Sequence, residues 1–96
     1  MAELLDDRTI DERLGARPAW RREGDEIVTD RKLTDFAAAM QFVNAVAEAA
    51  EVANHHPDIL LHGWNRVRLS VTNHSAGGLT QADFDLAATI DALPGS

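Results

Sequence analysis

The sequence has no cysteine among its 96 residues, which excludes disulfide bridges, thiolate metal sites and cysteine nucleophiles. It is also short of basic residues, with 9 Lys and Arg against 16 Asp and Glu and a formal charge of −7. Without a basic surplus to displace counterions, binding to nucleic-acid backbones or anionic lipid is disfavoured. No apolar run approaches the roughly 20 residues that a membrane-spanning helix needs. We therefore expect no nucleic-acid partner and no membrane segment.

Length and composition are those of a small globular chain. Hydrophobic residues make up 45% and charged residues 26%, and 96 residues correspond to about one domain. Residues 1–7, MAELLDD, are acidic where a secretion signal would be basic and then apolar. We expect one cytoplasmic domain over residues 1–96. Its core is modest, so oligomerisation would be an ordinary way to enlarge it.

The first third of the chain predicts a short helix followed by a hairpin. Thr9 and Glu12 have the spacing of a capping box, and Gly15 suits a left-handed helix end, so residues 10–14 should be helical. Gly at the first position of the Gly-Asp pair at 24–25 is typical of a two-residue hairpin turn. The strands on either side of it are expected at 20–23 and 26–32.

A long helix is expected from Asp35 to about Asn54. Pro57 disfavours helical angles at the residue before it, which ends the helix. Apolar side chains recur at helical spacing, and the opposite side is polar. The expected buried stripe consists of Phe36, Met40, Val43, Ala47 and Ala50, widened by Ala39 and Val46.

The last third predicts a second hairpin and a final helix. Residues 58–61 indicate a short strand, and residues 66–72 alternate between apolar and polar side chains. Thr80 should cap the last helix with Asp83 at its third position, and Leu79 and Phe84 should form a hydrophobic staple. The order of elements implies an α+β, two-layer sandwich: a four-stranded antiparallel sheet with about three helices on one face.

Three histidines stand at the ends of predicted elements. His55 and His56 follow the long helix, and His74 precedes the Gly-rich segment 75–78. Any one of them could simply be a favourable residue at a helix end. Together they suit either a zinc site or general acid–base chemistry near neutral pH. Adjacent histidines rarely both reach one metal ion, so the acid–base interpretation is favoured, without a defined reaction.

A longer pattern resembles a known family. Glu51, His55-His56-Pro57, Trp64, His74 and Asp83 have the spacing of the motif of pterin-4a-carbinolamine dehydratases. The segments NHHPD at 54–58, WNRV at 64–67 and HSAGGLT at 74–80 are similar to its bacterial branch. The resemblance extends from about Thr9 to Ile90, with the family's tryptophan after the first helix at Trp20.

The resemblance implies an enzyme that removes water from 4a-hydroxytetrahydropterin to give quinonoid dihydropterin, in the recycling of tetrahydropterin. It implies no metal and no cofactor, a homodimer or homotetramer, and an aromatic amino acid hydroxylase as the source of the substrate. The family fold is the four-stranded sheet with helices on one side that the patterns predict. The alternative is a non-catalytic oligomeric interaction module, because some members of the family bind and stabilise protein partners.

The resemblance also implies roles for single residues. His55 and His74 are expected to flank the reacting centre, with acid and base unassigned, and His56 to bind or orient the pterin. Glu51 precedes His55 by four residues and should orient its imidazole. Asp83 should reach the cleft or its histidine, cap the last helix, or do both.

Three further positions lie beside or outside this set. Trp20 and Trp64 are candidates to wall the pterin, although a tryptophan in so small a chain is also a natural core residue. His62 falls outside the motif and is expected on the surface. Asn54 stands where some relatives carry Asp, and it removes no group that proton transfer needs.

Overall fold

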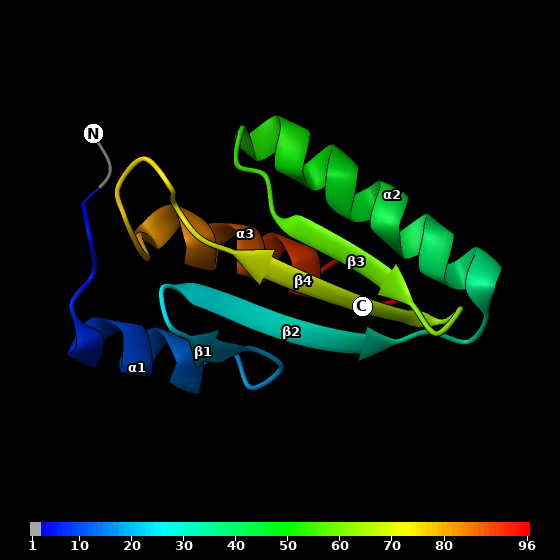
Figure 1. Cartoon of the computed structure of the whole chain (residues 1–96), viewed down its shortest axis with the longest axis horizontal. Helices are drawn as coiled ribbons and strands as arrows, with labels where there is room; N and C mark the ends of the chain where they lie inside the picture. Colours follow the sequence, from blue (N-terminus) through cyan, green and yellow to red (C-terminus); the bar gives the residue numbers. More distant parts are fainter. Residues whose placement is uncertain (1–2) are drawn as a thin grey trace.

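The computed structural model describes residues 3–96 as an antiparallel sheet with helices packed on one face (Figure 1). The elements are α1 (Asp7–Gly15), β1 (Arg21–Glu23), β2 (Glu26–Lys32), α2 (Phe36–Ala53), β3 (Asp58–His62), β4 (Arg66–Val71) and α3 (Gln81–Asp91). The strands lie in the order β1-β2-β4-β3, and all neighbours are antiparallel. The predicted α+β, two-layer architecture is confirmed.

The core lies between the sheet and the helices. Along β4, apolar side chains point alternately into this layer and are buried, while the arginines between them stay exposed on the other face. The strand residues pack in one cluster with apolar residues of all three helices. Members from successive elements are Ile10, Ile27, Phe42, Leu69 and Ile90.

The start of α1 differs from its prediction. Asp6 rather than Thr9 is the N-cap, and the Asp6 carboxylate accepts a hydrogen bond of 2.8 Å from the Thr9 N–H. Asp is at least as good a cap as Thr and stands three residues earlier, so the helix starts at Asp7. The predicted left-handed end at Gly15 is also wrong, because the helix ends with Ala16 in right-handed conformation.

The buried face of α2 is rotated from the predicted stripe. Phe36 and Met40 are exposed, at 54% and 38%, and Ala47 is exposed as well. The fully buried residues are Ala39, Phe42, Val46 and Ala50. The alanines of this helix lie on several of its sides, so the apolar spacing is compatible with more than one buried face. The bulky Phe42 decides which side meets the sheet. The polar side, which includes Asn44 and Glu48, is exposed as predicted.

The turns and the last helix follow their local signals. Gly24 has a φ of +61° while Asp25 does not have a positive φ, as a type II′ hairpin turn requires. Leu79 and Phe84 are both buried in the core, as the hydrophobic staple predicts. In the part of the chain that the structure describes, no helix combines the length and the apolar character needed to cross a membrane.

Candidate functional site

The site begins where α2 ends. Asn54 adopts the left-handed conformation, with φ +50° and ψ +43°, and the His55 N–H donates to the Ala50 carbonyl at 3.0 Å. Asn is among the few residues that tolerate this conformation, so the helix stops here, as predicted. The turn takes His55 off the helix and directs the two adjacent histidines to different partners.

His55 lies against a buried carboxylate of α3. Its Nε2 is 2.6 Å from Oδ1 of Asp83, and the side chains are 15% and 0% exposed. A carboxylate only accepts hydrogen bonds, so Nε2 carries the proton and donates it. In the neutral ring Nδ1 then holds the free lone pair. Asp83 therefore fixes the tautomer and the orientation of the His55 ring, as the carboxylate of a Ser-His-Asp triad does.

The other oxygen of Asp83 organises the start of α3. Its Oδ2 accepts hydrogen bonds from the Thr80 N–H at 2.7 Å and from the Thr80 hydroxyl at 3.2 Å. Asp83 is thus both a capping residue and the partner of a histidine, one of the possibilities that the sequence left open. Because Thr80 follows the loop that carries His74, this carboxylate connects that loop, α3 and the end of α2.

Glu51 has a different partner from the one predicted. Its Oε2 lies 2.5 Å from Nε2 of His56, not next to His55, and both side chains are largely exposed, at 76% and 60%. The four-residue spacing brings side chains together only while the helix continues. Since the left-handed Asn54 interrupts it, His56 turns back to Glu51 and His55 turns to Asp83.

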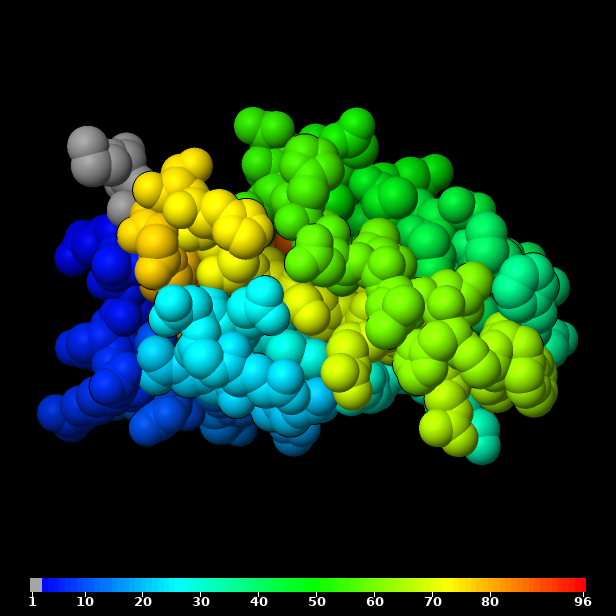
Figure 2. Space-filling view, viewed as in Figure 1, coloured from blue at the N-terminus to red at the C-terminus, as the bar shows by residue number. Residues whose placement is uncertain are grey.

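His74 follows β4, and His55 precedes β3. Because Asp58 at the start of β3 pairs with Ser70 near the end of β4, the loop after β4 and the segment before β3 lie at the same end of the sheet (Figure 1). His74 is exposed in the loop between β4 and α3, beside a pocket of about 220 Å³ whose lining includes Asp25, Glu26 and Asn73. Within residues 3–96 its side chain makes no hydrogen bond. Figure 2 shows the surface hollowed between this loop, in yellow, and the green segment after α2.

The two tryptophans lie away from His55. Trp20 is 4% exposed in the core, and its indole N–H donates to Asp91 at 3.0 Å, eight residues or about 12 Å along α3 from Asp83. Trp64 is 62% exposed in the turn after β3 (Asp58–His62), whereas His55 precedes that strand, so the two lie at opposite ends of β3. Neither tryptophan is brought beside His55 within this chain.

Sequence reasoning missed the network that holds Trp20. Asp91 also accepts from Arg31 at 2.6 Å, and the Arg31 guanidinium lies 5.8 Å from the centre of the Trp20 ring. No local pattern pairs residues 60 positions apart. His62 is exposed, as expected. In the described part of the chain, no three His, Asp or Glu side chains are grouped so that they could hold a metal ion.

Comparison with known proteins identifies the family of this chain. The family model described as "Pterin 4 alpha carbinolamine dehydratase" matches residues 3–93. The chain belongs to the pterin-4a-carbinolamine dehydratase family. A relative from Acidobacterium capsulatum, named "Putative pterin-4-alpha-carbinolamine dehydratase", is 55% identical over 97% of this chain and 99% of its own length. One of the same name from a Cyanothece species is 50% identical over 97% and 95%. Dehydratases of this family are hydro-lyases.

Two solved structures resemble this one. A structure from Brucella melitensis, titled as a transcriptional coactivator/pterin dehydratase, matches with a TM-score of 0.88 and 29% identity, over 94% of this chain and 97% of that one. A pterin dehydratase-like protein, titled as a RuBisCO assembly factor in the alpha-carboxysome, matches with a TM-score of 0.67 and 27% identity, over 81% and 92%. The dehydratase fold is therefore confirmed for this chain.

Proposed function

We propose that this chain removes water from a 4a-hydroxytetrahydropterin to give the quinonoid dihydropterin, as family membership suggests. The observation that carries the proposal is the 2.6 Å contact between His55 and the buried Asp83. It holds an imidazole in one tautomer on the segment after α2, and this segment borders the hollow seen in Figure 2. Dehydration breaks the C4a–O bond, removes the N5 proton and forms the C4a=N5 double bond, so it needs one proton acceptor and one proton donor.

His55 is the base in this proposal. Its Nε2–H is donated to Asp83, so the lone pair of Nδ1 is free to accept the N5 proton. The resulting imidazolium lies against the Asp83 carboxylate, which stabilises its charge without itself taking the proton. Because Asp83 already accepts from Thr80, it is fixed in place before substrate binds.

His74 is the acid. It donates a proton to the 4a-hydroxyl, which leaves as water. Its ring nitrogens are free of hydrogen bonds within residues 3–96, and its loop contains Gly77 at φ +81°, a conformation that glycine adopts readily. His56, paired with Glu51 at the rim, binds or orients the pterin. No metal or cofactor is needed for this proton transfer.

Stopped-flow dehydration of synthetic 4a-carbinolamine tests the reaction and the residues together. His55→Ala and His74→Ala should each lower the rate by roughly 10²–10⁴-fold, the contribution of one positioned acid or base. Asn44→Ala, on the exposed side of α2, is the surface control. Circular dichroism should show that all three variants fold. Wild-type-like rates in both histidine variants would refute the assignment.

The proposal includes a homodimer or homotetramer, with an aromatic amino acid hydroxylase supplying the carbinolamine. Exposed apolar residues on the edge strand β3 and on α2 support self-association. They include Ile59 and Leu60 at 37% and 53% exposure, and Val52 at 90%.

A second candidate function is a non-catalytic assembly or stabilising module. It is favoured by the structural likeness to the protein titled as a RuBisCO assembly factor. The stopped-flow assay separates the two, because a folded, oligomeric chain without dehydration activity would support the module.

A further inference from the structure

On the outer face of the sheet, two neighbouring basic side chains have no partner within residues 3–96. Nine Lys and Arg side chains occur in the chain. Within residues 3–96, six of them form ion pairs with carboxylates, and Arg13 donates to Gln81. The two that remain, Lys32 and Arg66, make no side-chain hydrogen bond or ion pair within these residues. Although the chain has 16 acidic residues, neither of these two cations has an acidic partner within residues 3–96.

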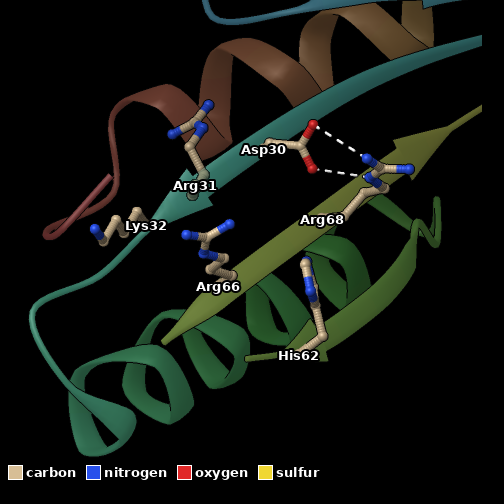
Figure 3. A pocket seen from close by; sticks show the side chains of 6 residues that line it. All are labelled: Asp30, Arg31, Lys32, His62, Arg66 and Arg68. Carbon is tan, nitrogen blue, oxygen red and sulfur yellow. Dashed lines mark hydrogen bonds and ion pairs between the residues drawn. The ribbon is translucent and has the colours of Figure 1, made fainter. Parts of the chain in front are cut away.

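Strand register places them side by side. Lys32 of β2 is directly opposite Arg66 of β4, and Arg66 is directly opposite His62 of β3. The three side chains therefore form one row across neighbouring strands, with Arg66 in the middle (Figure 3). Like charges directly opposite each other destabilise a sheet. An anion bound between them would remove this repulsion.

Asp30, two residues before Lys32 on β2, is a carboxylate that already has partners. Asp30 accepts hydrogen bonds from Arg68 at 2.8 Å and from Arg21 at 2.9 Å. The hydrogen bond from Arg68, and to a smaller extent that from Arg21, lowers the pKa of Asp30. Arg31 adjoins the row in sequence, but its guanidinium is held by Asp91 on the helix-covered face. Within residues 3–96, no carboxylate therefore forms an ion pair with Lys32 or Arg66.

The row borders a pocket of about 450 Å³, lined by Asp30, Arg31, Lys32, His62, Arg66 and Arg68. This pocket is separate from the His55 site. His62 ends β3 and Asp58 begins it, so the pocket lies four residues, about 13 Å, along the strand from the segment after His55.

We propose that Lys32, Arg66 and His62 form a binding site for the phosphate group of a small ligand. The planar fork of Arg66 suits two oxygens of a tetrahedral anion, Lys32 supplies a point charge, and His62 supplies a ring N–H. A phosphate offers three acceptor oxygens and nearly two negative charges, so it satisfies three donors, whereas a carboxylate offers two oxygens and one charge. The ligand is inorganic phosphate or a phosphate monoester. Nucleic acid is disfavoured by the net charge of −7.

Titration of the ¹⁵N-labelled full chain with inorganic phosphate, and separately with ribose 5-phosphate, tests the site. We expect saturable amide shifts at residues 32, 62 and 66 with both ligands. Tighter binding of ribose 5-phosphate would mark the monoester as the preferred ligand, and equal binding would mark phosphate alone; both results support the site. The double variant Lys32→Gln/Arg66→Gln should weaken binding by at least about tenfold, since each charge-assisted contact is worth about a factor of ten or more.

The matched control is Arg8→Gln, which also removes a positive charge but lies on α1 with its side chain 89% exposed. It should bind phosphate like the wild type. Phosphate should raise the melting temperature of the wild type and Arg8→Gln, and not that of the double variant. Non-saturating shifts, or equal binding by the double variant, would overturn the proposal. So would binding of single-stranded oligonucleotides that strengthens with their length and exceeds that of ribose 5-phosphate.

Discussion

Asp83→Asn should reverse the hydrogen bond to His55 while keeping the fold. The Thr80 N–H only donates, so the amide oxygen of the new side chain must face Thr80, where Oδ2 lies now at 2.7 Å. The amide nitrogen then faces Nε2 of His55, at the place of Oδ1. Since that nitrogen only donates, Nε2 must accept, and the imidazole proton moves to Nδ1. The lone pair that we assign to the base is lost.

The magnitude follows from these contacts. A wrong tautomer removes most of the contribution of a general base, so the dehydration rate should fall by roughly 10²–10⁴-fold. The fold loses the charge on one buried acceptor, worth roughly 1.5–3 kcal/mol, but keeps the cap of α3. This loss is smaller than the roughly 5–15 kcal/mol by which domains are stable, so the variant should remain folded at room temperature.

Stopped-flow rates and ¹⁵N spectra of the histidine rings together test this reasoning. The rate should fall, and the ring of His55 should change from the Nε2–H to the Nδ1–H form. Asp85→Asn is the matched control, since Asp85 lies on the same helix and is exposed. Within residues 3–96, its side chain accepts a hydrogen bond only from Gln81. A variant that shows the tautomer change and keeps the wild-type rate would refute His55 as the base.

Three further predictions concern metal, assembly and acid stability. EDTA should leave dehydration unchanged, because the proposed catalysis uses only proton transfer by histidines; loss of activity on chelation, with a stoichiometric metal found by mass spectrometry, would contradict this. Sedimentation equilibrium should give a mass above the 10.5 kDa of one chain, and Leu93→Asp should give a smaller, less heat-stable species if Leu93 lies in the interface. Asp30→Asn should cost at most about 1 kcal/mol at pH 7, because its ion pair with Arg68 is nearly half exposed. The fold lowers the pKa of Asp30. Its carboxylate therefore stabilises the protein at pH values above the pKa of the unfolded state, near 4, and this stabilisation is lost as the pH falls through the pKa of the folded state. Urea unfolding of the wild type and of Asp30→Asn across that pH range should show their difference in stability disappear.

Sequence alone determined the features that depend on neighbouring residues. The Gly24 turn, the helix end near Asn54 and the cap of α3 follow from backbone preferences and contacts within a few residues. Alternation placed the buried side of β4 correctly for the same reason. The spacing of the histidine motif was likewise sufficient for the family, since motif and spacing are properties of the linear chain.

Tertiary structure decided which distant groups meet. That Asp83 holds His55 while Glu51 holds His56 depends on how α3 packs beside the end of α2. The face of α2 that is buried was decided by fit against the sheet, because alanines made the helix apolar on several sides. The row of Lys32, Arg66 and His62 exists because β4 pairs with β2 on one side and β3 on the other. Local sequence leaves the partner of a strand open, since backbone hydrogen bonds are the same for any strand, and only the packing of the whole chain selects among them.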